Sequence, residues 1–277
     1  MKHIRQTPLC PDERLLMRRH RQQLLKSSAF VKRWLARQPA VKEESLTDWL
    51  LFDISERLPC VTYRAFTRHE EGKHTGADWE WWILFPNFSL RMRVQAKKLT
   101  PERDHYPELA RTNRHGLQIE RFLADCKTAN AVPLYAFYSA LDSSPVSRAG
   151  TARDGAFVAD GQRVYDGFVA GPRKPVAAIE ILRLSTALSS ILRFPPGSSG
   201  SGEMAMRFLR SQLQAGVLHT STESISARGI YDIIPEHILS LMQARRNGVS
   251  GSWENEFDSL LQGYRALLIH DFRELRD

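Results

Sequence analysis

Cysteine and long apolar runs are both scarce in this sequence. The three cysteines, Cys10, Cys60 and Cys126, lie far apart in 277 residues, so we expect neither a disulfide framework nor a zinc knuckle. No apolar run approaches the roughly 20 residues that a membrane-spanning helix needs. No apolar stretch follows the basic N-terminus, so we expect no secretory signal. Together these absences predict a cytoplasmic protein that has no membrane partner.

Charge is distributed unevenly along the chain. Hydrophobic residues make up 42% of the sequence and charged residues 25%, a balance that is typical of a globular protein and excludes general disorder. Residues 1–40 contain ten lysines and arginines but only two acidic residues, which accounts for the whole net charge of +8. A basic segment on a neutral remainder predicts contact with a polyanion such as nucleic acid, and a solvated helix face is the alternative.

Periodic patterns in the first half of the chain predict an α-β-β-β-α-β order of elements. Apolar residues at helical spacing indicate helices, and β-branched or aromatic residues with alternating polarity indicate strands. In chain order we expect helices at 13–38 and 44–58, strands at 60–67, 78–85 and 88–97, a helix at 115–128 and a strand at 132–140. The second and third strands are expected to form a hairpin across Pro86 and Asn87.

The second half has weaker patterns, which favour helices. We expect a strand or hairpin at 155–170, a flexible loop at 195–202, and helices at 176–193, 203–215, 235–246 and 252–272. The fold class is therefore α/β with a mostly helical C-terminal part. The expected organisation is a basic helical arm at 1–40, a core at 41–170 and a helical region at 171–277 that packs on the core.

Asp78, Gln95 and Lys97 are the residues with the clearest chemical potential. Side chains alternate between the two faces of a strand, so Gln95 and Lys97 share one face of the third strand. A hairpin register can bring Asp78 beside them at one end of the sheet, because neighbouring strands lie about 4.8 Å apart. A carboxylate, an amide oxygen and an ammonium suit phosphodiester hydrolysis with a hard cation such as Mg²⁺. A strand whose polar face points to solvent is the alternative.

The sequences Gly76-Ala77-Asp78 and Gln95-Ala96-Lys97, placed on these strands, resemble the PD-(D/E)xK nuclease superfamily. The resemblance covers residues 44–140 and is closest to the Mrr-like, restriction-endonuclease-like branch, in which the motif often reads QxK. It implies that Asp78, Gln95 and the Ala96 carbonyl bind Mg²⁺ or Mn²⁺ and that Lys97 is the catalytic lysine.

The resemblance also implies a further acidic residue on the first core helix. Our first choice is Glu44, at the start of the helix, and the alternatives are Glu43 and Glu56. Glu70 and Glu71, in the loop before Gly76-Ala77-Asp78, could also complete the site. Glutamine at position 95 removes one negative charge from the motif, and the superfamily includes members that have lost catalysis.

We therefore expect a metal-dependent endonuclease that cuts DNA, with a role in bacterial defence against foreign DNA. The alternative is a catalytically decayed nuclease fold that binds nucleic acid or a protein partner, and RNA, a homo-oligomer and a defence-system partner stay open. The residues expected to contact nucleic acid are Arg18, Arg19, Arg21, Arg91, Arg93 and Gln118.

Three other groups of residues receive structural interpretations. Loop histidines without a zinc spacing are His69, His74, His105 and His115, and linker serines without a P-loop lysine are Ser198, Ser199 and Ser201. Trp79, Trp81 and Trp82 are expected in the core.

Overall fold

The computed structural model describes residues 11–65, 76–99, 106, 109, 112–113, 116–141, 153–171, 177–194, 201–213, 228–246 and 265–273. Its helices are α1 (Pro11–Arg37), α2 (Glu43–Arg57), α3 (Gln118–Thr128), α4 (Gly161–Phe168), α5 (Ala178–Leu184), α6 (Gly202–Leu213), α7 (Glu236–Arg246) and the 3₁₀ helix η1 (Leu188–Ser190). Its strands are β1 (Val61–Ala65), β2 (Trp79–Leu84), β3 (Ser89–Lys98), β4 (Thr112–Asn113), β5 (Gly116–Leu117), β6 (Val132–Tyr138), β7 (Ala156–Asp160), β8 (Thr186–Ala187), β9 (Ile230–Tyr231) and β10 (Ala266–Asp271).

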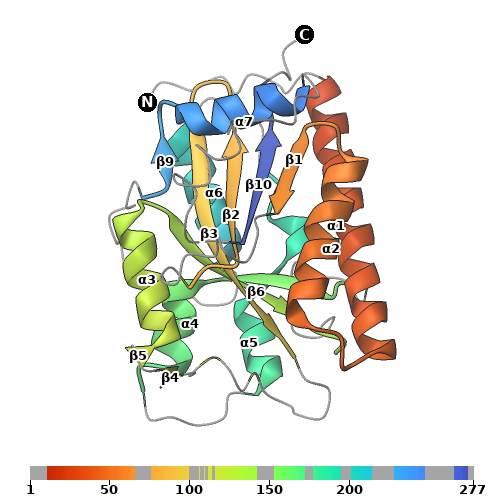
Figure 1. Ribbon diagram of the computed structural model, residues 1–277, viewed down its shortest axis with the longest axis vertical. Coiled ribbons are helices and arrows are strands. Elements are labelled where there is room, and N and C mark those ends of the chain that lie inside the picture. Colours follow the sequence, from red (N-terminus) through yellow and green to blue (C-terminus); the bar gives the residue numbers. More distant parts are fainter. Residues whose placement is uncertain are drawn as a thin grey trace, which may run out of the picture.

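One mixed sheet dominates the structure, with the strand order β1-β10-β2-β3-β6-β7-β8 and with β9 paired to β3 (Figure 1). β2 and β3 form the expected antiparallel hairpin, and β6 lies parallel to β3 on its other side. β10 comes from the C-terminal end of the chain and lies parallel to β2 and antiparallel to β1. β2 and β3 therefore occupy the middle of the sheet, where neighbours on both sides fix their register.

Helices cover both faces of the sheet. On one face, α1, α2 and α6 pack on the inward side chains of the central strands, among them Trp81, Met92 and Leu268. On the other face, α3, α4 and α5 pack on Tyr135 and Phe157, and α7 packs further along β2 and β10. The alternation along β2 separates Trp79 and Trp81 from Trp82, and all three rings are buried as expected.

Most elements predicted for the first 140 residues are confirmed within a few residues: α1, α2, β1, β2, β3, α3 and β6. In the second half, α6 and α7 are also confirmed. Two predictions there are wrong in part. Only 156–160 of the segment 155–170 is a strand, and 161–168 is helix α4; the helix expected at 176–193 is the short α5, followed by β8 and η1.

The helix expected at 252–272 is wrong over residues 266–271, which form the interior strand β10. Its six residues are all buried, and a short apolar run of this kind does not distinguish a buried strand from a buried helix. Because β10 separates β1 from β2, the C-terminal part is an integral part of the sheet and not a helical layer on it. The predicted α/β class is confirmed. The first and second strands in the chain, β1 and β2, are not neighbours, because β10 lies between them.

The basic N-terminal helix is also part of the core. Leu24, Val31 and Leu35 of α1 are fully buried in the main apolar cluster. Ser28 Oγ accepts hydrogen bonds from the backbone N–H groups of Gly155 and Ala156 at 2.9 and 3.0 Å, which ties α1 to the start of β7. The expected arm at 1–40 is therefore, over its described residues, a structural layer whose outer side is basic.

None of the helices described is both long and apolar enough to cross a membrane.

Candidate active site

The hairpin of β2 and β3 brings Asp78 and Gln95 into direct contact. Asp78 immediately precedes β2, and its backbone N–H donates to the carbonyl oxygen of Val94 at 2.8 Å, which extends the ladder by one residue. Gln95 Nε2 donates to Asp78 Oδ2 at 2.6 Å, and the backbone N–H of Ala96 donates to the same oxygen at 2.6 Å. The two strands thus hold one carboxylate oxygen between two N–H donors.

Burial and nearby charges shift the proton equilibrium of Asp78. Burial raises the pKa of this carboxyl from its ordinary value to about 6, and the negative charge of Glu44 acts in the same direction. The charge of Lys97, the N–H of Ala96 and the charge of Arg265 lower the pKa and so oppose the increase. Lys97 lies two residues beyond Gln95, on the same face of β3, and is buried.

Gln118, the first residue of α3, adds a third side chain to this group. Its Nε2 donates to Gln95 Oε1 at 3.3 Å, so a chain of donors runs from Gln118 through Gln95 to Asp78. Gln118 Oε1 is buried and has no hydrogen-bond partner among the described residues. A buried oxygen without a partner, on a residue hydrogen-bonded to Gln95, is a position that a cation or a water can complete.

The acidic residues proposed to complete the site have different environments. Glu43 Oε2 accepts a hydrogen bond from the backbone N–H of Lys98 at 2.5 Å, so this carboxylate pins α2 to the end of β3. Glu44 is exposed and its charge reaches Asp78. Glu56 is exposed near the other end of α2. Glu44 therefore remains the best placed of these candidates, while Glu70 and Glu71 lie outside the described residues.

Two residues that the sequence analysis did not select, Arg265 and Asp48, also lie close to Asp78 at this end of the strands. The backbone N–H of Arg265 donates to the Asp78 carbonyl oxygen at 2.9 Å. The guanidinium Nη2 of Arg265 lies 2.6 Å from Asp48 Oδ2. Asp48 lies one helical turn after Glu44, a spacing that places both on one side of α2 and could have indicated it. Arg265 had no comparable signal, because its segment was expected to be helical.

Arg91 and Arg93 are placed differently from our expectation. Arg91 Nη2 and Arg93 Nε donate to Oε2 of Glu80, a fully buried carboxylate, at 2.9 and 3.1 Å. Arg93 also pairs with Asp125, and Arg91 Nη1 donates to the carbonyl oxygen of Ala129 at 2.7 Å. The fully buried carboxylate of Glu80 holds both guanidinium groups, and their side chains are only 18% and 8% exposed. We therefore assign both arginines to the protein interior and no longer expect them to contact nucleic acid.

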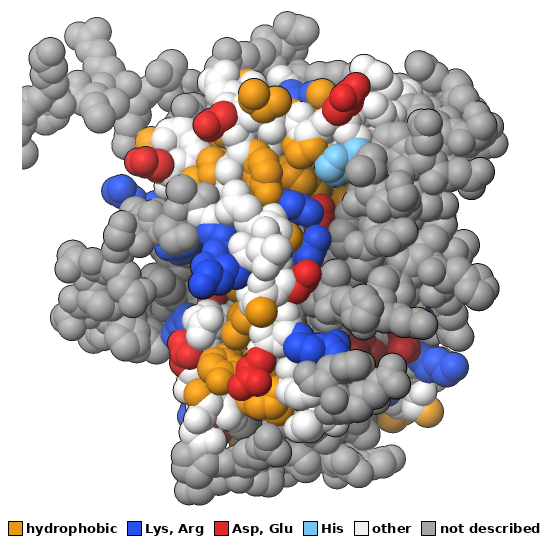
Figure 2. Space-filling view, turned by 60° about the vertical axis from the view of Figure 1, so that its left-hand side comes forward, with side chains coloured by type: hydrophobic (Ala, Val, Ile, Leu, Met, Phe, Trp, Pro, Cys, Tyr) orange, Lys and Arg blue, Asp and Glu red, His pale blue; other side chains and the backbone are white. Residues whose placement is uncertain are grey.

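The face that carries α3 and α7 shows cationic and acidic side chains close together among the described residues (Figure 2). It therefore does not display one sign of charge over its described area.

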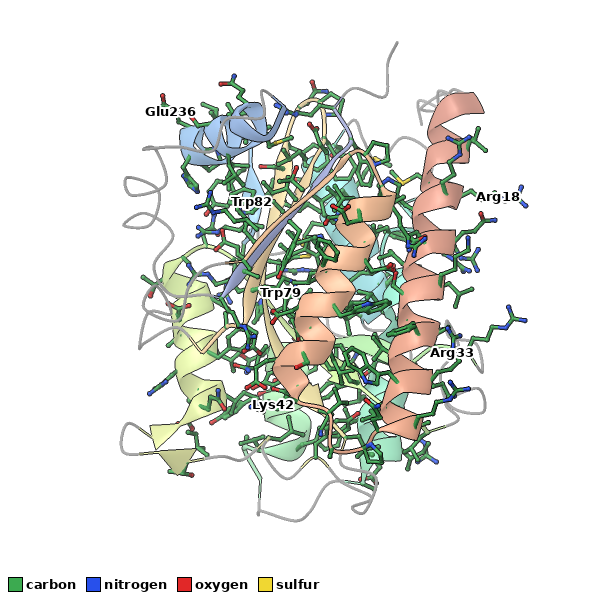
Figure 3. All side chains as sticks on the ribbon, turned by 45° about the vertical axis from the view of Figure 1, so that its right-hand side comes forward. Arg18, Arg33, Lys42, Trp79, Trp82 and Glu236 are labelled. Carbon is green, nitrogen blue, oxygen red and sulfur yellow. The ribbon has the colours of Figure 1, made fainter. Side chains whose placement is uncertain are left out.

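The outer side of α1 keeps the basic character predicted for it. Arg18, Arg19 and Arg21 are exposed, and Arg18 and Arg33 point away from the sheet (Figure 3). A cavity of about 790 Å³ lies along this side, with apolar residues between cationic ones. It is lined by Gln22, Leu25, Lys26, Ala29, Lys32, Arg33, Ala36 and Arg153. This surface belongs to the helix layer opposite α3, whereas Asp78 and Gln95 lie on the α3 side of the sheet.

A hard cation fits the donor set at Asp78 in part. Within the described residues no group of three or more His, Cys, Asp or Glu is arranged to hold a metal. The oxygen atoms available for a cation are those of the Asp78 carboxylate and of the Gln95 and Gln118 side-chain amides. Glu44 on α2 is the further acidic candidate. Mg²⁺ is commonly bound through one or two carboxylates while it keeps several waters, so this set reaches the lower limit of what it needs.

The Gln95 amide turns its nitrogen toward Asp78 in this structure, and a half-turn of that amide would present its oxygen instead. The Ala96 carbonyl oxygen lies 3.4 Å from Gln95 Nε2, beside the same group.

The remaining candidates carry no further chemistry. His69, His74, His105, His115, Ser198 and Ser199 lie outside the described residues. Ser201 precedes α6, where its Oγ accepts from the backbone N–H of Met204 at 3.4 Å.

Comparison with known proteins places the chain in a family. No curated protein and no solved structure matches it. The family match extends over residues 20–266, which include most of α1, the β2–β3 hairpin, the Asp78 cluster and Arg265. The chain therefore belongs to DUF6615, a family of unknown function.

Proposed function

We propose that this protein is a metal-dependent endonuclease that hydrolyses phosphodiester bonds of DNA at the Asp78 cluster. The observation that carries the proposal is the contact of 2.6 Å between Gln95 Nε2 and Asp78 Oδ2, with the charge of Lys97 acting on the same carboxylate. The carboxylate and the amide come from the two adjacent strands, and Lys97 lies two residues beyond Gln95 on the same face of β3. The resemblance to PD-(D/E)xK nucleases assigns these three residues to one site.

Each side chain has a defined part in the proposed reaction. Asp78, Gln95 and Glu44 would hold Mg²⁺ or Mn²⁺, which when bound neutralises phosphate charge and lowers the pKa of water. Asp78 must be ionised to do so, and a pKa of about 6 leaves it mostly ionised at neutral pH. Lys97 donates hydrogen bonds that orient the attacking water or stabilise charge developing on the phosphate oxygens.

DNA is the proposed substrate because the Asp78 cluster suits phosphodiester hydrolysis and because the protein also carries a basic helix, although α1 lies on the opposite side of the sheet from the cluster. Exposed arginines on α1 and a net charge of +8 favour a polyanion. Contacts to the phosphate backbone bind without reading base sequence, so the helix supports affinity rather than specificity. RNA has the same backbone charge, and the experiment below includes it.

A second function has one observation in its favour. Position 95 carries an amide where an acid would strengthen metal binding, and no three-residue cluster of acidic or other metal-binding side chains occurs among the residues described. A nucleic-acid-binding module without catalysis is consistent with this donor set. It predicts DNA binding without turnover in any divalent metal.

Plasmid cleavage tests the proposal. The wild-type protein is incubated with supercoiled DNA, or with single-stranded RNA, in Mg²⁺ or Mn²⁺. We expect nicking of DNA that Asp78→Asn and Lys97→Met each reduce at least 100-fold, with unchanged circular dichroism. Matched controls on exposed helix positions, Asp166→Asn and Lys127→Met, should cut like the wild type. Equal cutting by all four variants would show that the site lies elsewhere.

A further inference from the structure

The C-terminal strand brings an arginine next to Asp78. β10 lies parallel to β2 with Ala266 opposite Trp79, so the residues that precede the two strands, Arg265 and Asp78, are neighbours. The backbone N–H groups of Arg265 and Ala266 both donate to the Asp78 carbonyl oxygen, at 2.9 and 3.2 Å. The backbone position of Arg265 is therefore fixed by the same residue that supplies the carboxylate of the proposed site.

The side chain of Arg265 is held from α2. Its Nη2 lies 2.6 Å from Asp48 Oδ2, and the two side chains are 22% and 41% exposed. No other hydrogen bond engages the guanidinium among the described residues. Asp48 Oδ1 is buried and also lacks a hydrogen-bond partner within the described part of the chain. The guanidinium thus keeps donors available at a position that solvent reaches.

Two cationic residues lie at the end of the strands that carries Asp78. Arg265 directly precedes β10 and is hydrogen-bonded through its backbone to Asp78, and Lys97 lies on β3, the other neighbour of β2. A guanidinium is planar and presents its donors as a fork that matches two oxygens of a phosphate, which an ammonium does not.

We propose that Arg265 binds a backbone phosphate of the nucleic acid next to the scissile bond, and that Asp48 positions its guanidinium. This inference rests on the proposed function, because the phosphate must lie beside Asp78. A purely structural role, in which the ion pair only fastens α2 to β10, is the competing explanation. The two differ in what happens to DNA affinity and to its dependence on salt.

Binding without divalent metal separates these explanations. Affinity for a short duplex is measured by fluorescence anisotropy in EDTA over a series of salt concentrations. We expect Arg265→Gln to weaken binding about tenfold and to reduce the slope of log K against log salt by about one, as for the loss of one phosphate contact. Arg265→Lys should keep the slope and recover part of the affinity, because its charge remains.

The matched control is Arg57→Gln. Arg57 also pairs with an aspartate, Asp53, at 2.7 Å, but near the other end of α2. Arg57→Gln removes the same charge as Arg265→Gln does, and we expect it to keep the DNA affinity and the salt dependence of the wild type. Asp48→Asn should bind DNA within about twofold of the wild type and cut it about tenfold more slowly in Mg²⁺, because the guanidinium is then less well positioned.

The outcomes distinguish this inference from the proposed function. If Arg265→Gln keeps the parental affinity and slope, the inference is wrong, whether or not the wild type cuts DNA. If Arg265→Gln melts at a lower temperature with an unchanged slope, the role is structural and the inference is again wrong. If the wild type binds DNA but cuts none in any metal, the proposed catalysis is wrong. The salt dependence of binding by Arg265→Gln still tests whether Arg265 contacts a phosphate. Absence of DNA binding by the wild type overturns both.

Discussion

Gln95 Nε2 and the backbone N–H of Ala96 both point at Asp78 Oδ2, each at 2.6 Å. Two N–H donors thus satisfy the oxygen that a cation would bind in the proposed reaction. For the Gln95 side chain to become a ligand, its amide must turn and exchange its donor for its oxygen. The hydrogen bond from Gln118 Nε2 to Gln95 Oε1 favours the orientation seen here. If the cluster binds a metal as proposed, we expect the orientation of the Gln95 amide to set the balance between the metal-free and metal-bound forms.

Replacing this glutamine with glutamate should strengthen metal binding. In Gln95→Glu two carboxyl groups lie within hydrogen-bond distance, and without metal they cannot both ionise at low cost. We expect Mn²⁺ affinity to rise at least tenfold in calorimetric titrations at pH 8. We also expect the metal-free variant to melt below the wild type at pH 8 and close to it at pH 5.

The matched control is Gln162→Glu, which also creates a glutamate beside an aspartate. Gln162 Nε2 donates to Asp166 Oδ1 at 2.8 Å on the exposed side of α4. This variant should bind Mn²⁺ like the wild type. Unchanged Mn²⁺ affinity in Gln95→Glu would mean that position 95 does not face the cation.

Cleavage should depend on pH through Asp78. Burial raises the pKa of this carboxyl to about 6, and only the ionised form holds a metal. With metal below saturation, the initial rate of plasmid nicking should rise about tenfold per unit up to pH 6 and level off above it. A cleavage rate that stays constant between pH 5 and pH 7 would show that the reaction does not depend on the ionisation of Asp78.

Stability should respond to the same group with the opposite sign. The folded protein binds the Asp78 proton more tightly than the unfolded chain does, so this group stabilises the fold below about pH 4. That contribution is lost as pH rises toward 6. Relative to the wild type, Asp78→Asn should therefore gain about 2 kcal/mol between pH 4 and pH 8, after allowance for partial exposure.

Urea unfolding of both proteins at the two pH values measures this gain. The buried rings of His20 and His270 have lowered pKa values, and they act equally in both proteins and cancel in the comparison. The same stability difference at pH 4 and pH 8 would show that the Asp78 carboxylate is well solvated in the folded protein.

Glu80 should matter for stability. Its carboxylate is fully buried and accepts hydrogen bonds from Trp82 Nε1 at 2.7 Å and from Arg91 and Arg93. Glu80→Gln removes the charge that compensates two largely buried guanidinium groups, at a cost of about 3–5 kcal/mol in the free energy of unfolding. The control Glu120→Gln, on the exposed side of α3, should cost less than about 1 kcal/mol. Chemical denaturation measures both free energies of unfolding. A smaller decrease for Glu80→Gln than for the control would contradict the assignment of Arg91 and Arg93 to the core.

The sequence predicts the middle of this fold well and its C-terminal part poorly. Strict alternation along residues 88–97 predicts β3 and its hairpin, and the contact of Asp78 with Gln95 follows from that register. Residues 266–269 form an apolar run without alternation, so their pattern does not specify a strand, and nothing local indicates that they pair with β2. Arg265 could not be placed near the site for this reason.

Side-chain roles were harder to predict than strands. Arg91, Arg93 and Lys97 share one face of β3, and the sequence offers no reason to separate them. Their roles differ because Glu80 on β2 and Asp125 on α3 lie beside the two arginines. Such partners come from elements distant in the chain, and only the three-dimensional packing identifies them. The choice between Glu43 and Glu44 likewise depends on a single contact, to the backbone of Lys98.

The most direct measurement of the central claim is the binding of Mn²⁺ to the protein without DNA, followed by electron paramagnetic resonance. We expect the wild type to bind one Mn²⁺ at millimolar concentration and Asp78→Asn to lose this binding, while Asp166→Asn keeps it. A wild-type protein that binds no Mn²⁺, or an Asp78→Asn variant that binds it as the wild type does, would contradict the assignment of a metal-dependent site to these two strands.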